Sequence, residues 1–258
     1  MDKTHENQNY QAKGNSLYGR EMNSGHPLQN YYSRIYRTYD LVNALFTLGL
    51  DKKWRRFTAK ECLSANPERI LDLCCGTGDL AITLMKNAGD KVSVTGYDLN
   101  AEMLVIAKRK ALHEKVDITF IQGDAGSMPF QNDEFDSITI GFGFRNLTWE
   151  NPNRDRHVSE ISRILKPGGK LFVLESARPE SKIVGFFYTL YLKLILIPLG
   201  GFLSGDWNAY RYLAGSSSGF YSFPQLLKLL DTQLMDLHLR KKFLFGSVNL
   251  LIAIKRRM

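Results

Sequence analysis

The sequence is poor in cysteine and carries no grouped metal ligands. Its 258 residues include three cysteines, Cys62, Cys74 and Cys75, and no CxxC pair. An odd count without regular spacing argues against a disulfide framework and a zinc site, and is typical of a reducing compartment. The five histidines are scattered without ligand spacing, so no metal site is expected.

The start of the chain lacks the apolar segment that forms a secretory signal. Residues 1–26 are polar and rich in Asn, Gln and Gly, and we expect them to form a flexible tail. Residues 27–258 have the length of one α/β domain with additions, so a single domain is predicted. Together with the cysteine usage, these features predict a cytoplasmic protein.

Acidic residues are outnumbered by basic ones. Lys plus Arg number 34 and Asp plus Glu number 26, which gives a formal net charge of +8. Such a surplus favours an anionic partner, either nucleic acid or an anionic membrane surface. The basic residues are dispersed and are not interleaved with stacking aromatics, so we expect no nucleic-acid partner.

Short apolar runs alternate with helical segments in most of the chain, which predicts a parallel, doubly wound sheet. Strands are predicted at Arg69–Leu73, Lys91–Tyr97, Asp117–Ile121, Asp136–Ile140, Lys170–Leu174, Leu234–Phe243 and Val248–Lys255. Helices are predicted at Asp79–Asn87, Asn100–His113, Asn151–Leu165 and Pro224–Leu230. Two further helices are expected within residues 27–66, one over Tyr31–Leu48 and one that begins at a capping Asp51.

An apolar insert, residues 179–222, interrupts this alternation after the fifth strand. Within it, Ile183–Leu203 is long enough to span a bilayer, but it contains Lys193, Pro198 and three glycines. An amphipathic lid over an apolar pocket, or a helix at a membrane interface, fits these residues better. A plain core helix is the alternative.

A glycine turn follows the first strand of the predicted sheet. Residues 70–79 read ILDLCCGTGD, which is a strand, a turn with Gly76 and Gly78, and a helix start. The two glycines let a ligand approach the backbone closely, and the N–H groups of the helix start favour an anionic group. The alternative is a turn without a ligand. The third glycine of a dinucleotide fingerprint is missing, which favours a mononucleoside cofactor over NAD.

Acidic residues end the next two strands. Asp98 follows the glycines by about 20 residues, where a carboxylate can accept hydrogen bonds from a ribose diol. Helix capping is the alternative role for Asp98. Asp124 ends the third strand, where its carboxylate could meet an adenine amino group, and Ala125 leaves room for the ring.

Further motifs make the sequence similar to class I S-adenosylmethionine methyltransferases. The shared motifs are LDL at residue 71, GTGD at 76, GDA at 123, MPF at 128, FD at 135 and LKPGG at 165. More specific motifs are YDxxN at 39, Gly49, WRR at 54, FGFRN at 142, LES at 174, Pro179, YRYL at 210, Ser216 and FP at 223. Together they resemble the menaquinone/ubiquinone biosynthesis C-methyltransferases from about Tyr31 to the C-terminus.

This resemblance implies an α/β, Rossmann-like class I fold. Its features would be a seven-stranded, mostly parallel sheet, a helical N-terminal extension and an apolar helical insert after strand five. The implied reaction is S-adenosylmethionine-dependent C-methylation of a prenylated quinol, demethylmenaquinol to menaquinol. A benzoquinol or another small lipophilic acceptor is the alternative substrate. The implied partners are the quinol, the anionic inner face of a membrane and a second copy in a homodimer.

The resemblance implies that Thr77, Asp98, Asp124 and Ala125 contact the cofactor. The predicted cofactor site also includes Asp72, Gly76, Gly78, Leu99 and Gly141. Two positions depart from the family pattern. Gly141 stands where the family usually has a serine that contacts the cofactor, and Leu251 where it usually has a histidine. Glycine at position 141 puts one hydrogen bond to the cofactor in question. Leucine at position 251 either alters the substrate pocket or has little effect. Cys74 and Cys75 are interpreted as small packing residues.

Arg145, Asn146, Tyr39 and Asp40 are the candidates for the chemistry. A quinol ring carbon becomes nucleophilic as the neighbouring hydroxyl loses its proton, so the enzyme must align the reactants and support a phenolate. Arg145 is expected to support that phenolate and Asn146 to orient the hydroxyl or a water. Tyr39 and Asp40 are candidates to accept the proton. The alternatives are a structural tie from Arg145 to Glu175 and a core role for Tyr39.

Overall fold

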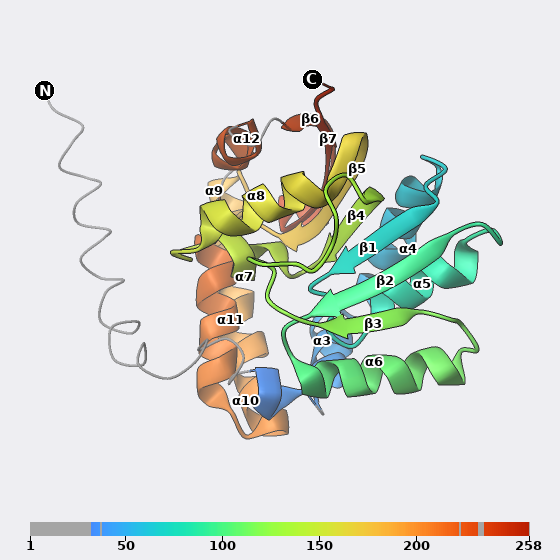
Figure 1. Ribbon diagram of the computed structural model, residues 1–258. Helices are drawn as coiled ribbons and strands as arrows, with labels where there is room; N and C mark the ends of the chain where they lie inside the picture. Colours follow the sequence, from blue (N-terminus) through green and yellow to red (C-terminus); the bar gives the residue numbers. More distant parts are fainter. Residues whose placement is uncertain (1–31, 37, 222, 232–234, 258) are drawn as a thin grey trace, which may run out of the picture.

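Figure 1 shows a computed structural model of the chain, which describes residues 32–36, 38–221, 223–231 and 235–257. The strands form one sheet in the order β3-β2-β1-β4-β5-β7-β6. Their bounds are β1 Arg69–Leu73, β2 Ser93–Asp98, β3 Thr119–Gln122, β4 Phe135–Gly141, β5 Leu165–Ser176, β6 Met235–Phe243 and β7 Val248–Lys255. Strands β1 to β5 pair in parallel, and β7 runs antiparallel between β5 and β6. The predicted seven-stranded, mostly parallel, Rossmann-like sheet is confirmed.

Helices cover both faces of this sheet. Their bounds are α3 Tyr39–Phe46, α4 Leu50–Leu63, α5 Asp79–Asn87, α6 Ala101–His113, α7 Phe144–Thr148, α8 Arg154–Ile164, α9 Lys182–Tyr191, α10 Ile197–Ser204, α11 Trp207–Gly219 and α12 Phe223–Asp231. In Figure 1, α8 lies in front of the sheet and α4 and α5 behind it, with α10 and α11 beside the strand ends. Along β1, Ile70 packs on the α4/α5 side, and Leu71 and Leu73 pack on the α8/α12 side. Each such buried side chain contributes about 1.5–3 kcal/mol to folding.

The strand and helix bounds differ from the predicted ones at several ends. β5 begins at Leu165, because residues 166–169, predicted as a turn, bulge out of a strand that is already paired with β4 at Phe135. Gly168 allows the bulge with a φ of +79°. The third strand lies at Thr119–Gln122 and not at Asp117–Ile121, and α8 starts at Arg154 and not at Asn151. The predicted tail, the helix start at Tyr31 and the strand start at Leu234 lie outside the described residues.

The N-terminal helical prediction was wrong in two places. Residues 32–35 are helical, but the backbone turns at Tyr36, so Tyr31–Leu48 is not one helix. The capping prediction for Asp51 was also wrong, because Gly49, with a φ of +72°, precedes a helix that starts at Leu50. Asp51 lies in the first turn, where it accepts a hydrogen bond from Thr47 Oγ1 at 3.0 Å. At α6 the predicted cap is confirmed: Asn100 Oδ1 accepts from Met103 N at 2.9 Å.

The apolar insert after strand five is confirmed as a group of helices. α9, a π-helical turn at Leu192–Leu196 and α10 continue into one another, and α11 packs against them. Together with α3 they enclose a small separate core around Val42, Leu192 and Tyr210. The continuous helix Lys182–Ser204 is long and apolar enough to cross a membrane, and only 17% of its most apolar stretch is buried.

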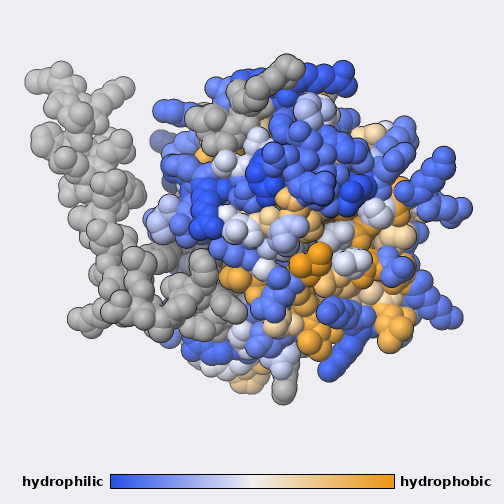
Figure 2. Space-filling view, viewed as in Figure 1, coloured by the Kyte–Doolittle hydropathy of each residue, from blue (hydrophilic) through white to orange (hydrophobic). Residues whose placement is uncertain are grey.

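The view in Figure 2 shows how unevenly hydrophobic residues are distributed over one face of the molecule. The upper half of this face is mainly hydrophilic, and the exposed hydrophobic residues gather in the lower half. The exposed large hydrophobic side chains of the chain include Leu48, Leu112, Ile183, Phe202 and Phe245, each at least 72% exposed. Three of these five, Leu48, Ile183 and Phe202, lie in or next to the helices that cap the strand ends.

Candidate functional site

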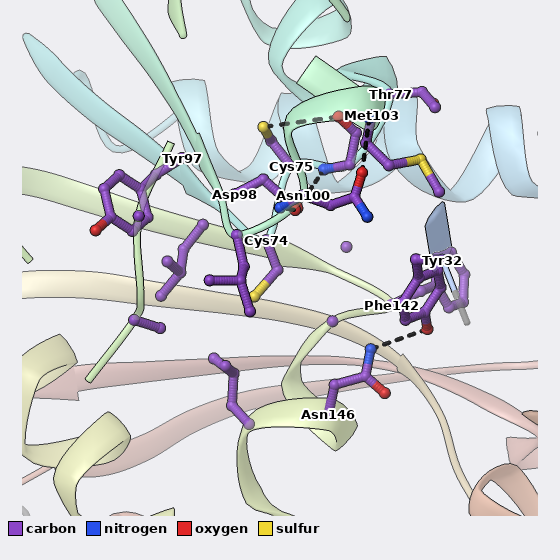
Figure 3. Close-up of a pocket in the computed structure, with 18 of the residues that line it drawn as sticks. Tyr32, Cys74, Cys75, Thr77, Tyr97, Asp98, Asn100, Met103, Phe142 and Asn146 are labelled. Atoms are coloured by element: carbon purple, nitrogen blue, oxygen red, sulfur yellow. Dashed lines mark hydrogen bonds between the residues drawn. The ribbon is translucent and has the colours of Figure 1, made fainter. Parts of the chain in front are cut away.

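The carboxyl ends of β1, β2, β3 and β4 surround a cavity that we term the cofactor cavity. Parallel sheets of this type bind ligands at this edge. The side chains and backbone that line it belong to Tyr32, Tyr39, Arg55, Leu73, Cys74, Cys75, Gly76, Thr77, Asp79, Tyr97, Asp98, Leu99, Asn100, Met103, Gly123, Asp124, Ala125, Gly141, Phe142, Gly143, Asn146, Leu147, Asn151 and His157. Figure 3 shows these elements from inside, with the Cys74–Cys75 turn beside Asp98 and Asn100.

Asp72 and Gly78 shape this cavity without lining it. Asp72 is 1% exposed and accepts hydrogen bonds from Ala81 N at 3.0 Å and Thr139 Oγ1 at 2.8 Å. Burial raises the pKa of Asp72 to about 7, although its hydrogen bonds act in the opposite direction. Gly78 has a φ of +81°, and a Cβ there would lie 2.9 Å from Ala107 Cβ. Both residues therefore hold the turn in place and are not positioned as direct cofactor contacts.

Asp98 presents a fixed carboxylate at the end of β2. Its Oδ2 accepts from Gly76 N and its Oδ1 from Asn100 N, each at 2.8 Å. Burial raises the pKa of Asp98, and these N–H groups lower it. The backbone N–H of Leu99 lowers this pKa as well, so three backbone donors serve the carboxylate. A carboxylate has about four acceptor positions, so Asp98 keeps one for a diol hydroxyl in the cavity.

The far end of the cavity suits a flat ring. Leu99, Met103 and Leu147 supply apolar contacts, and Ala125 leaves space between them. Asp124 Oδ1 accepts from Gly126 N at 2.9 Å and lies 3.7 Å from His157 Nε2. An acidic acceptor next to apolar walls is the arrangement that an adenine with its amino group requires.

A polar cluster joins α3 to the glycine turn. Thr77 Oγ1 donates to Asp40 Oδ1 at 2.7 Å, and Lys110 Nζ lies 2.6 Å from both Asp40 Oδ2 and Asp79 Oδ1. Asp40 lines neither the cofactor cavity nor the apolar cavity described next. Its carboxylate is used to hold α3 over the turn.

A second, mainly apolar cavity adjoins the first, and the two share Tyr39, Arg55 and Phe142. We term it the apolar cavity. Its other lining residues are Asn43, Phe46, Thr47, Asp51, Trp54, Arg145, Ser176, Val184, Phe187, Tyr188, Tyr191, Leu196, Leu213, Ser217, Leu244, Phe245, Ser247 and Val248. Most of them come from α3, α4 and the helical insert, and the rest come from α7, the end of β5 and residues 244–248. The insert therefore forms one wall of this cavity as well as part of the surface.

Arg145 reaches the apolar cavity and is held by a buried acid. Its Nη1 lies 2.9 Å from Glu175 Oε1 and donates to Ser176 Oγ at 2.6 Å, and both charged side chains are 3% exposed. The backbone N of Arg145 also donates to Glu175 at 3.1 Å. The nearby carboxylate raises the pKa of Arg145 although burial alone would lower it. Nε of Arg145 is buried and has no hydrogen-bond partner among the described residues.

Asn146 and two tyrosines stand where the cavities meet. Asn146 Nδ2 donates to Tyr32 Oη at 2.9 Å, and the two side chains point toward one another in Figure 3. Asn146 Oδ1 is buried without a partner in the described chain. Tyr32 and Tyr39 pack edge to face, with ring centroids 5.8 Å apart. Burial raises the pKa of both phenols, so both keep their protons at neutral pH.

The structure thus brings most of the predicted site residues to one place. Gly76, Thr77, Asp98, Leu99, Asp124, Ala125 and Gly141 line the cofactor cavity, together with Asn146 and Tyr39. Arg145 and Tyr39 line the apolar cavity. The predicted site residues did not include Tyr32, Arg55 and Phe142, although the WRR and FGFRN motifs contain the last two. Arg55 lies in the WRR motif, whose side-chain directions only the packing of α4 could reveal.

Folds of known methyltransferases resemble this one at low sequence identity. An O-methyltransferase family protein from Burkholderia thailandensis has a TM-score of 0.64 and 13% identity, over 97% of this chain and 70% of that one. An S-adenosylmethionine-dependent methyltransferase from Clostridium acetobutylicum has a TM-score of 0.61 and 15% identity, over 86% and 98%. These likenesses show a class I methyltransferase fold.

Residues 20–255 match the model of one sequence family. The chain belongs to the ubiE/COQ5 methyltransferase family. It is 40% identical over 199 residues to a demethylmenaquinone methyltransferase of Thermus thermophilus, covering 77% of this chain and 88% of that protein. It is 35% identical to a ubiquinone/menaquinone biosynthesis C-methyltransferase of Shewanella pealeana, over 69% of this chain and 70% of that protein.

The family resemblance predicted from the motifs is confirmed, and with it the cofactor, S-adenosylmethionine. The cofactor cavity fits this molecule. Asp98 offers an acceptor for the ribose diol, Asp124 and the apolar residues suit adenine, and Arg55 and the N–H groups of the turn suit a carboxylate. Which of these residues touch the cofactor stays a prediction.

Proposed function

We propose that this ubiE/COQ5-family methyltransferase methylates a ring carbon of a prenylated quinol, converting demethylmenaquinol to menaquinol. The observation that carries the proposal is the apolar cavity, which meets the cofactor cavity at Tyr39, Arg55 and Phe142. A lipophilic ring in the apolar cavity would face the end of the cofactor cavity. The names of relatives such as the Thermus thermophilus enzyme support the same acceptor.

The chemistry requires alignment of the two reactants and support for a developing phenolate. S-adenosylmethionine, when bound, supplies an activated methyl group. In the reaction the quinol hydroxyl would give up its proton as the ring carbon takes the methyl group, the ring carbon would then lose its hydrogen as a proton, and the oxygen would regain a proton, so that one proton is released overall to solvent. Alignment in a closed site can supply several kcal/mol of barrier reduction, and a preorganised donor about 3 kcal/mol more.

Arg145 is our candidate to support the phenolate. Glu175 fixes the guanidinium from one side, and the buried Nε remains free to donate to an acceptor oxygen. Asn146, with an unpartnered Oδ1, is our candidate to orient the quinol hydroxyl or a water. These roles follow from unused hydrogen-bonding atoms at the wall of a cavity, since a buried polar atom without a partner is costly unless a ligand satisfies it.

Tyr39 and Asp40 are poorly suited to accept the proton. The raised pKa of Tyr39 keeps it a neutral phenol, which donates a hydrogen bond more readily than it takes a proton. Asp40 is held by Thr77 and Lys110 outside both cavities. We therefore assign Tyr39 an orienting role, and we assign Asp40 to holding α3 in place.

We also propose a peripheral contact with the anionic inner face of a membrane, with the rest of the protein in the cytoplasm. Phe187, Leu244 and Phe245 line the apolar cavity and are 47–86% exposed, so apolar side chains surround its entrance. Lys182 and Lys193 are exposed on the same helical insert. A prenyl chain could then pass from the bilayer to the cavity without crossing water. The homodimer stays a prediction, which the mass of the purified protein in solution checks.

A methylation assay with both quinol classes tests the proposed function. Purified protein with S-adenosylmethionine is given demethylmenaquinol or a matching demethylated benzoquinol, and the products are read by mass spectrometry. We expect a 14-dalton gain on the naphthoquinol ring carbon, the mass of one methyl group replacing hydrogen. Faster methylation of the benzoquinol would move the protein to ubiquinone biosynthesis, and no gain on either would overturn the proposal.

A further inference from the structure

Arg55 occupies an unusual position between the two cavities. It lies on α4, is 8% exposed and lines both the cofactor cavity and the apolar cavity. Its guanidinium carbon stands 5.3 Å from the centre of the Phe142 ring, and Phe142 follows the last residue of β4. The cation is therefore held at the carboxyl end of β4, inside the site.

The charge of Arg55 is only loosely paired. Its ion pair with Asp51 has a nitrogen-to-oxygen distance of 3.8 Å, which is too long for a hydrogen bond. Its Nε is buried and has no hydrogen-bond partner in the described part of the chain. Arg145, the other buried arginine of the site, is paired at 2.9 Å. A buried guanidinium with such a long ion pair retains donors for a ligand anion.

Among the described residues that line the cofactor cavity, Arg55 is the one lysine or arginine. Three aspartates, Asp79, Asp98 and Asp124, also line that cavity. S-adenosylmethionine carries one carboxylate, at the end of its methionine portion. Guanidinium and carboxylate form strong charge-assisted hydrogen bonds. We propose that Arg55 binds the methionine carboxylate of the cofactor.

The order of the strands places that carboxylate at Arg55. The strands lie in the order β3, β2, β1, β4 from one edge of the sheet inward. Asp124 follows the end of β3, Asp98 ends β2, the Gly76 turn follows β1, and Gly141 ends β4. With the adenine at Asp124 and the ribose at Asp98, the ligand extends across the Gly76 turn to the end of β4. The methionine portion then reaches Gly141, where the guanidinium of Arg55 lies.

Gly141 provides the room for this arrangement. A Cβ at position 141 would lie 3.1 Å from Arg55 Nη1 and 3.3 Å from Leu80 Cδ2. A Cβ there would require the guanidinium or Leu80 to shift by a few tenths of an ångström. Without a side chain at position 141, the serine contact to the cofactor that is usual in the family is lost. The same absence leaves room for Arg55 Nη1 to lie close to the backbone of Gly141.

Calorimetry with a matched pair of ligands tests the proposal without any quinol. S-adenosylhomocysteine keeps the carboxylate, and its decarboxylated form, S-adenosyl-(3-thiopropyl)amine, lacks only that group. The natural protein is expected to bind the first about ten- to a hundredfold more tightly, the loss expected for one charge-assisted contact. In Arg55→Gln this preference should fall to about twofold or less, and Arg55→Lys should keep part of it. As the matched control, Arg56→Gln changes an exposed neighbour and should leave the preference for S-adenosylhomocysteine unchanged.

Three results would overturn the proposal: no preference in the natural protein, an equal loss of both ligands in Arg55→Gln, or a full preference in that variant. If Arg55→Gln does not fold, Arg55→Lys replaces it, because Lys keeps the charge and loses the planar fork; a full preference in a folded Arg55→Lys protein would then overturn the proposal. Because the acceptor takes no part in these measurements, failure here leaves the proposed quinol reaction standing, and failure of the quinol assay leaves this proposal standing.

Discussion

Arg145 and Glu175 form an ion pair at the wall of the apolar cavity, with Nη1 2.9 Å from Oε1 and both side chains 3% exposed. Removing one partner leaves a buried charge uncompensated. We expect Glu175→Ala to lower the free energy of unfolding by about 3–5 kcal/mol, measured by urea denaturation. Glu180→Ala, which breaks an exposed pair with Lys242, should cost about 1 kcal/mol or less. Equal losses in the two variants would contradict the role of burial.

Arg145 itself is predicted to act in the chemical step. Arg145→Lys keeps the charge and loses the planar fork, so turnover should fall by more than tenfold, and by more again in Arg145→Ala. Affinity for S-adenosylmethionine should change little, because Arg145 lines the apolar cavity and not the cofactor cavity. Melting temperature, cofactor affinity and turnover are measured on the same preparations. A variant that loses stability and keeps normal turnover per folded molecule would make Arg145 architectural.

Asp98 is predicted to hold the ribose. Asp98→Ala removes a carboxylate that is oriented by three backbone N–H groups, so cofactor binding should weaken by about 1.5–3 kcal/mol. Isothermal calorimetry with S-adenosylhomocysteine measures this loss. The exposed Asp90, changed to Ala, is the matched control and should leave the affinity unchanged. Unaltered affinity in a folded Asp98→Ala protein removes Asp98 from the site.

Asp72 predicts how stability depends on pH. Its folded-state pKa of about 7 lies above the ordinary value of an aspartate, so the folded state binds the extra proton. The stabilising contribution is complete below about pH 4 and is lost as the pH rises toward 7, with a slope of up to about 1.4 kcal/mol per pH unit. In Asp72→Asn the free energy of unfolding should depend less on pH between about pH 4 and 7.

Asp136 is the control for that measurement. Its pKa is lowered by its hydrogen bonds from Lys166 and from the backbone of Arg69 and Glu68, although partial burial acts in the opposite direction. Its contribution has the opposite sign, present above the ordinary pKa and lost as the pH falls through the lowered one. Asp136→Asn should therefore change the free energy of unfolding below about pH 4. Its slope with pH between 4 and 7 should stay as in the natural protein. Urea titrations at each pH give both profiles.

The apolar side chains around the entrance predict membrane binding. Phe187 and Phe245, which line the apolar cavity, are 61% and 86% exposed, and changing both to Ser should reduce sedimentation with anionic liposomes several-fold. Binding of the natural protein should fall as salt is raised from low to physiological concentration. Leu112→Ser, at an 80% exposed position on α6, is the matched control. A protein that ignores liposomes under all these conditions has no such contact.

Local patterns in the sequence were sufficient to predict the sheet, the glycine turn and the acids that follow β2 and β3. Alternating apolar runs, glycines at left-handed positions and the Asn100 cap depend on neighbours within a few residues, so a linear reading captures them. The errors came at strand and helix ends, one from a distant pairing partner and one from the left-handed turn at Gly49. β5 begins early because Leu165 already pairs with Phe135, and α4 begins at Leu50, one residue before the predicted capping Asp51.

By itself, the sequence determined the order of the elements, the identity of the family motifs and the strand ends that carry Asp98 and Asp124. Only the tertiary structure decided that Arg145 is paired with Glu175, that Tyr32 meets Asn146, and that Arg55 lies against Gly141. These contacts join residues 30 to 114 positions apart. They follow from how the helical residues 32–35, α4 and α7 pack against the strand ends, because packing fixes which face of each helix points inward.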